Sequence, residues 1–272
     1  MRNGDLVSAL DAAVAAPRQH TKLDRLNPVT RIGLAMIVTV PLVLTLDWLS
    51  ASVMLVLVVA VGLWAGFSPA QLARRLAALF LVGLVAATSM ALYGQPGGRE
   101  WLDLLLIRVT DNSLLLAAAV LMRMLALGLS AVLLLGDVDP TDLADGLAQV
   151  LRLPTRFVLG GLAGLRMVDL FVDDWRALGL ARRARGLGDV GRLRRWLSMA
   201  FALLVMAVRR GSRLATAMEA RGFGPETART RTWARPSRLH RVDAVGVVAG
   251  AAMVSASVVV AVLFGTTHWV FS

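Results

Sequence analysis

The sequence predicts an all-α, polytopic integral membrane protein with about five transmembrane helices. Of its 272 residues, 57% are hydrophobic, and several apolar runs are long enough to cross a bilayer hydrocarbon core of about 30 Å. The formal net charge is +11, yet residues 174–241 alone hold 16 arginines against four acids. Membrane spans are therefore combined with one concentrated basic segment, which the positive-inside rule places in the cytoplasm.

Four spans are expected in residues 27–135, after a cytoplasmic leader over residues 1–26. The leader lacks the apolar core and the small-residue cleavage site of a signal peptide. Asn27 and Pro28 supply an N-cap and a first-turn proline, and Ser68 with Gln71 has the spacing of a capping box. The expected spans are 32–46, 51–67, 76–93 and 113–135, and residues 93–112 suit an extracytoplasmic loop.

One arginine lies inside an expected span. Arg123 is near the middle of residues 113–135, where a charge costs at least a few kcal/mol unless it snorkels or finds a partner. It is therefore either a functional intramembrane charge or a structural one that pairs with a carbonyl or an acid on another helix. Both interpretations stay open at the level of sequence.

Residues 136–241 are expected to form coupling helices at the inner membrane face, and residues 242–272 the final span and tail. Asp139 and Pro140 are a strong helix start. Residues 155–173 are expected to be partly embedded, and the apolar run 196–208 is too short to span. For two apolar faces we expect internal packing, with contact to lipid or to another membrane protein as the alternatives: Leu143/Leu147/Leu151 and Trp196/Leu197/Phe201/Leu204.

The basic segment contains two copies of one pattern, A-x-x-A-R-G-x-G, 36 positions apart. The copies contain two triplets: Ala184-Arg185-Gly186 and Ala220-Arg221-Gly222. Each copy begins in helix-forming residues and stops at a glycine, where helices commonly take a left-handed C-terminal turn. Each arginine is therefore expected in a last helical turn between small neighbours, from which its side chain can enter a pocket on a partner.

A search for chemistry in the chain itself is largely negative. The three histidines, His20, His240 and His268, are far apart, so neither a metal site nor a catalytic histidine is expected. Lys22 is the only lysine, and no Walker-type phosphate loop is present. The basic segment has few aromatic residues for base stacking, so no nucleic acid is expected as a partner. A membrane subunit that depends on a separate energy-supplying subunit is therefore favoured over a membrane-embedded enzyme.

These features resemble the transmembrane T component of energy-coupling factor (ECF) vitamin and metal transporters. Two Ala-Arg-Gly helix ends precede one last span, residues 23–31 are similar to the family's leader, and residues 139–143 with Pro154 resemble its entry into the coupling region. The resemblance covers residues 22–264. It implies that Arg185 and Arg221 dock into grooves of two ATP-binding-cassette ATPases, which bind ATP and magnesium, while a small membrane subunit binds the substrate.

The function implied is that of a non-catalytic coupling subunit of an importer, without a cofactor of its own and multi-pass in the cell membrane. The alternative is a membrane-anchored basic platform that binds acidic lipids or proteins and transports nothing. Helix dipoles stabilise cations near C-termini, and inner-face arginines bind lipid head groups, so charge alone explains one Ala-Arg-Gly end. Charge does not explain why the whole pattern recurs with both glycines.

Overall fold

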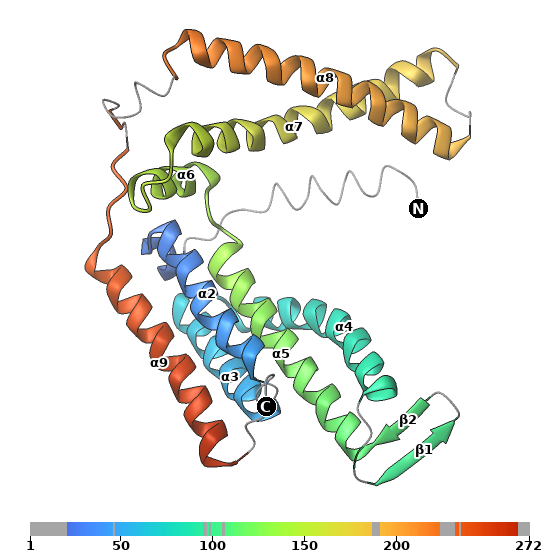
Figure 1. The fold of residues 1–272 in the computed structure, drawn as a ribbon, viewed down its shortest axis with the longest axis vertical. Helices are drawn as coiled ribbons and strands as arrows, with labels where there is room; N and C mark the ends of the chain where they lie inside the picture. Colours follow the sequence, from blue (N-terminus) through green and yellow to red (C-terminus); the bar gives the residue numbers. More distant parts are fainter. Residues whose placement is uncertain are drawn as a thin grey trace. The chain divides into compact units, whose positions relative to one another are not determined.

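Figure 1 shows the computed structural model, in which the regular structure is almost entirely helical. The structure describes residues 21–45, 47–94, 97, 99–104, 107–186, 191–223, 232–233 and 235–265. The all-α fold class is confirmed. Residues 1–20 of the expected leader, the last glycine of each repeat copy and the tail beyond residue 265 lie outside the described residues. The rest forms two compact units, one up to Val138 and from Leu239 onward, the other Asp139–Arg238.

The first unit holds the apolar helices. Its helices are η1 (Lys22–Arg25), α2 (Pro28–Leu44), α3 (Trp48–Ala65), α4 (Pro69–Tyr93), α5 (Asp111–Leu135) and α9 (Arg241–Leu263). By length and composition α3, α4, α5 and α9 can each cross a membrane, whereas α2 is an apolar helix of 17 residues. Four of the five expected spans are therefore found as helices long enough to cross, while the first expected span is a helix of 17 residues, about 25 Å long.

Helix starts in this unit follow the capping residues that the sequence contains. The Asn27 side chain accepts a hydrogen bond from the backbone N–H of Val29 at 3.0 Å, which caps α2. At the start of α4 the Ser68 hydroxyl accepts from the Gln71 N–H at 3.3 Å, and the Gln71 side chain accepts from the Ser68 N–H at 3.0 Å. The predicted N-cap and capping box are thus confirmed, because each satisfies amide groups that have no partner within the helix.

The core of this unit lies where α2 and α3 pack between α5 and α9, and α4 packs on α5. Leu42, Met54 and Leu129 are fully buried there. Gly250 lets α9 approach α2 closely, since a Cβ at this position would lie 2.5 Å from a methyl group of Leu34. Apolar side chains on the outer surface of α4, such as Leu81 at 69% exposure, fit a lipid environment.

Residues 100–110, within the expected loop of residues 93–112, contain regular structure that the sequence did not indicate. Two strands, β1 (Glu100–Leu104) and β2 (Ile107–Thr110), pair antiparallel with Glu100 opposite Thr110 and Leu104 opposite Ile107. The β-branched side chains of β2 favour an extended backbone. Thr110 then caps α5, since its hydroxyl accepts from the Ser113 N–H at 3.3 Å. The connection between α4 and α5 is therefore a short hairpin.

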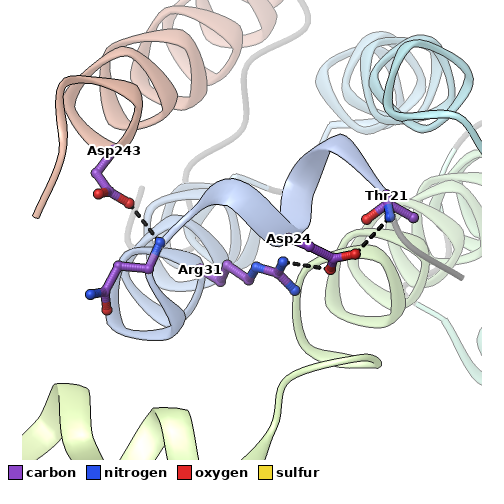
Figure 2. Close-up of polar contacts among 5 residues, drawn as sticks. Thr21, Asp24, Arg31 and Asp243 are labelled. Atoms are coloured by element: carbon purple, nitrogen blue, oxygen red, sulfur yellow. Dashed lines mark hydrogen bonds and ion pairs between the residues drawn. The ribbon is translucent and has the colours of Figure 1, made fainter. Parts of the chain in front are cut away.

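The carboxylate of Asp243 joins the start of α2 to the start of α9 (Figure 2). Asp243 is buried at 3% exposure near the start of α9. One carboxylate oxygen accepts a hydrogen bond from the backbone N–H of Asn27 at 2.7 Å, and the other accepts from the N–H of His240 at 2.7 Å. The residue that caps α2 is thereby fastened to the N-terminus of α9, 216 positions away in the sequence.

An ion pair between the buried Arg31 and the more exposed Asp24 holds the segment before α2 (Figure 2). Arg31, 4% exposed, donates to Asp24 at 2.7 Å, and the Thr21 N–H donates to the same carboxylate at 2.6 Å. Burial opposes ionisation of Asp24, but these hydrogen bonds and the Arg31 charge outweigh it, so the pKa of Asp24 lies below its usual value. Leu23 and Leu26, assigned to the leader from sequence, are buried in the core of this unit.

The second unit contains α6 (Pro140–Gln149), α7 (Thr155–Ala184) and α8 (Arg192–Ala220). Residues 155–173, expected to be partly embedded, form the first part of the continuous 30-residue α7. The apolar run 196–208 lies inside the 29-residue α8. Neither α7 nor α8 is among the helices apolar enough to span a membrane, in agreement with the prediction that residues 196–208 do not span.

Helix α6 holds the segment that leads back toward α9. Asp139 caps it as predicted, accepting from the Thr141 N–H at 2.7 Å. The Gln149 side-chain amide donates to the carbonyl of Arg235 and accepts from the N–H of Ser237, both at 2.9 Å. One side chain thus pairs with two backbone groups of this segment. Arg235 also lies 3.4 Å from the Asp142 carboxylate. Residues 235–237 are thereby fastened to the end of α6.

One of the expected packing positions, just beyond the end of this helix, needs correction. The buried residues of α6 are small ones, Ala144, Gly146 and Ala148. Leu151, expected to pack internally, is 54% exposed. Close packing through alanine and glycine leaves a large side chain beyond the end of the helix without cover.

Candidate functional site

The first Ala-Arg-Gly triplet forms the C-terminus of α7. The helix ends at Ala184, and Arg185 follows as its C-cap with φ −90° and ψ 9°. Gly186 takes the left-handed conformation at φ +71°, and its N–H donates to the Arg183 carbonyl at 3.0 Å. A Cβ on Gly186 would meet nothing within 4 Å, so the backbone conformation, not space, requires glycine here.

The second triplet repeats this geometry at the end of α8. The helix ends at Ala220, Arg221 follows with φ −89° and ψ 10°, and Gly222 has φ +79°. The Phe223 N–H donates back to the Met218 carbonyl at 3.1 Å, the bond of a Schellman end. The predicted left-handed turn is therefore confirmed at both copies, since the C-cap arginines have nearly identical angles and the glycine φ angles are 71° and 79°.

Both arginines are presented to the outside. Arg185 and Arg221 are exposed, and so are the four small residues beside them. Among the described residues, neither guanidinium forms an ion pair with an acid. Each therefore offers its five N–H donors at the tip of a helix. Figure 1 shows that the C-terminal ends of α7 and α8 point in opposite directions within this unit.

Two further arginines, Arg182 and Arg183, precede the first triplet and lie in different environments. Arg182 reaches across to α8 and donates a hydrogen bond to the Ser198 hydroxyl. Arg183 is exposed. One of the two thus contributes to contact between α7 and α8, and the other remains at the surface beside Arg185.

Residues that sequence reasoning missed also connect α7 with α8. Arg210 contacts the carboxylate of Asp174 with both terminal nitrogens, at 2.8 and 3.4 Å. The rings of Trp175 and Trp196 meet edge to face with centroids 5.0 Å apart. The sequence offered one signal, since Asp174 and Arg210 stand 36 positions apart, as Arg185 and Arg221 do.

The apolar face of α8 is open, contrary to the internal packing expected from sequence. Leu197, Phe201 and Leu204 are 63%, 68% and 58% exposed, and Trp196, despite its contact with Trp175, is 58% exposed. These side chains recur at helical spacing, so they form one stripe. A stripe of this kind marks contact with lipid or with another apolar protein surface.

Arg123 finds its partners at the turn between α2 and α3. Its guanidinium donates to the carbonyl of Thr45, the C-cap of α2, where the helix dipole favours a cation. The Asp47 carboxylate, 2% exposed, supplies a nearby negative charge and accepts from the Ser50 N–H at 2.8 Å. These contacts support the structural interpretation of Arg123, in which the charge fastens the α2–α3 turn to α5.

Replacing Arg123 by leucine is expected to lower the free energy of unfolding by about 2–4 kcal/mol, because the buried Asp47 loses its counter-charge. Tryptophan fluorescence during thermal unfolding in detergent measures this loss. The neighbouring Met124→Ala, at a 39% exposed position, is the control and is expected to change stability little. Equal stability of wild type and Arg123→Leu would contradict the structural role.

The comparisons with known proteins agree with the resemblance. The sequence matches the family described as cobalt transport protein, CbiQ, over residues 19–232, more than half of the chain. It is 28% identical over 192 residues to the energy-coupling factor transporter transmembrane protein EcfT of Limosilactobacillus fermentum, covering 65% of this chain and 68% of that one. It is 25% identical over 221 residues to the EcfT protein of Listeria innocua, covering 77% and 83%.

The matched region contains both Ala-Arg-Gly helix ends and every helix from η1 to α8. A third relative, the EcfT protein of Bacillus selenitireducens, is 26% identical over 219 residues, covering 76% of this chain and 81% of that one. The resemblance to the T component of ECF transporters is therefore confirmed, and the chain is a multi-pass membrane protein that belongs to the CbiQ family of cobalt transport proteins.

Proposed function

We propose that the chain is the coupling subunit of an ECF-type importer, in which Arg185 and Arg221 dock into two ATP-binding-cassette ATPases. The observation that carries the proposal is the repeated helix end, with the same triplet and the same backbone angles on two separate helices. Two equivalent helix ends suit two equivalent binding grooves, one on each ATPase. The family match and the EcfT relatives support the same assignment.

The mechanism follows from the mechanics of the two helices. ATP and magnesium bind to the partner ATPases, whose closing and opening moves the groove that holds each arginine. Because each arginine lies at the capped end of a long helix, displacement of the groove displaces the helix as a whole. A guanidinium suits such a joint, since its planar fork makes several hydrogen bonds to one acidic or carbonyl-lined groove. The chain itself takes no catalytic step.

The open stripe on α8 is the proposed contact for a third partner. Leu197, Phe201 and Leu204 are each more than half exposed, an arrangement that fits the apolar surface of a small substrate-binding membrane subunit. That subunit takes up a vitamin or a metal ion. Under this proposal the basic segment faces the cytoplasm, where the ATPases are.

A second candidate function is a basic platform that binds acidic lipids. It is favoured by the combination of exposed arginines and an exposed apolar stripe on α8. The two candidates differ in what they need: a lipid platform requires no ATPase, and its binding weakens steeply with salt.

The test is co-purification in mild detergent of the chain with its candidate pair of ATP-binding-cassette ATPases, at low and at high salt. Co-elution of both ATPases at both salt concentrations supports the importer. Binding to vesicles of acidic phospholipid that disappears at high salt, with neither ATPase retained, supports the platform instead. ATP-dependent uptake by the reconstituted complex would then identify the substrate class.

A further inference from the structure

Polar and aromatic side chains connect α7 with α8. These contacts lie within residues 174–182 of the 30-residue α7 and 196–210 of the 29-residue α8. Trp175 also meets Trp196, and between the two polar contacts the Met199 side chain, 5% exposed, reaches Gly179. The two helices cross where these side chains meet, and Figure 1 shows the crossing of their backbones.

The Asp174–Arg210 ion pair joins two positions that have the same spacing to the two arginines of the triplets. Asp174 stands eleven residues before Arg185, and Arg210 stands eleven residues before Arg221. Eleven residues are about three helical turns, so each member of the pair lies on the same side of its helix as the following arginine, about 16 Å away along the axis. The ion pair is thus placed at the same helical distance from both arginines.

The ion pair constrains the crossing in a way that the aromatic contact does not. Both terminal nitrogens of Arg210 face both oxygens of Asp174, at 2.8 and 3.4 Å, so the pair has a defined direction. Edge-to-face rings tolerate a range of positions. Asp174 and Arg210 have side-chain exposures of 23% and 36%, so their attraction is only partly screened by solvent.

We propose that Asp174 and Arg210 are positioning residues, which fix the crossing of α7 and α8 and so set the separation and direction of Arg185 and Arg221. This inference rests on the proposed function, because the two arginines need a fixed spacing only if each docks into the groove of its own ATPase. Neither Asp174 nor Arg210 touches a partner in this scheme. They act through the helices whose ends carry the docking side chains.

The test measures the distance between the two helix ends in the isolated chain. Because the chain has no cysteine, spin labels can be attached at Arg183→Cys and Glu219→Cys, which are exposed and equivalent in the repeat. Double electron–electron resonance then gives the distance distribution for wild type, Asp174→Asn, Arg210→Asp and the swap Asp174→Arg/Arg210→Asp. Asp173→Asn is the matched control, since Asp173 pairs with Arg176 on the same helix at 3.4 Å.

The single variants are expected to broaden or shift the distribution, with a change of up to about fivefold in the population of the wild-type distance. The swap is expected to restore it, and the control to leave it unchanged. Asp174→Asn, nearly isosteric, keeps the test valid where Arg210→Asp does not fold. An unchanged distribution in the single variants, or one that the swap does not restore, overturns the proposal.

The same variants in the complete complex separate this inference from the proposed function. If both hold, both ATPases remain bound to the single variants, uptake falls up to about fivefold, and the swap recovers it. Failure of wild type to bind the ATPases refutes the proposed function, while the distance measurement on the isolated chain still decides the role of the ion pair.

Discussion

Replacing Arg185 and Arg221 together by alanine is expected to abolish co-purification of both ATPases. Each arginine is exposed at a helix end with no acidic partner among the described residues, so its hydrogen-bonding capacity is available to another protein. Truncating an interface anchor of this type costs about 2–4 kcal/mol, or roughly 30-fold or more in affinity for each joint. Single replacements are therefore expected to weaken one joint, and the double replacement to remove both.

The control for this prediction is a double variant with the same loss of charge. Arg183→Ala/Arg213→Ala removes two exposed arginines from the same basic segment and leaves both helix ends intact. It is expected to retain both ATPases. If both double variants lose the ATPases alike, general charge attracts them and the helix ends are not the joints. Lysine at positions 185 and 221 is expected to recover little binding, because an ammonium lacks the guanidinium fork.

Asp243→Ala is expected to lower the free energy of unfolding of the membrane unit by about 2–4 kcal/mol. The substitution leaves the backbone N–H groups of Asn27 and His240 without their acceptors in a site that is 3% exposed at Asp243. The joint between the start of α2 and the start of α9 is lost. Denaturant unfolding in detergent, followed by tryptophan fluorescence, measures the change.

Two further variants make this test specific. Asp243→Asn keeps one oxygen acceptor of similar shape and is expected to lose less stability than Asp243→Ala. Val242→Ala, one position earlier and 48% exposed, shortens a side chain at the same helix end and is expected to have little effect. A loss with Val242→Ala equal to that with Asp243→Ala would mean that α9 is merely sensitive to substitution at its start.

Local signals account for most of what could be predicted of the fold. Caps at Asn27, Ser68 and Asp139 act on amides a few residues away, so sequence spacing is enough to recognise them. The hairpin at residues 100–110 was missed because its apolar side chains suit an interfacial loop equally well. The joint at Asp243 was missed because it connects residues 216 positions apart.

In the candidate site, too, features that depend on local sequence could be predicted, whereas features that depend on tertiary packing could not. The helix ends at Arg185 and Arg221 could be predicted, since a glycine after a helical segment signals a left-handed turn locally. The contact between Trp175 and Trp196 could not, because it depends on how two helices cross. The exposure of Phe201 was misjudged for a related reason: apolar periodicity tells which face is apolar, and not what covers it.

The hydrogen bonds of the Gln149 side chain anchor the far end of the segment that follows α8. Phe223 closes the end of α8, and Arg235 is held against α6, twelve positions later. A chain of that length extends to at most about 40 Å. While the Gln149 side chain keeps its hydrogen bonds to residues 235–237, this length limits the distance between Arg221 and α6. The length of the connecting segment therefore sets the largest displacement that the end of α8 can make.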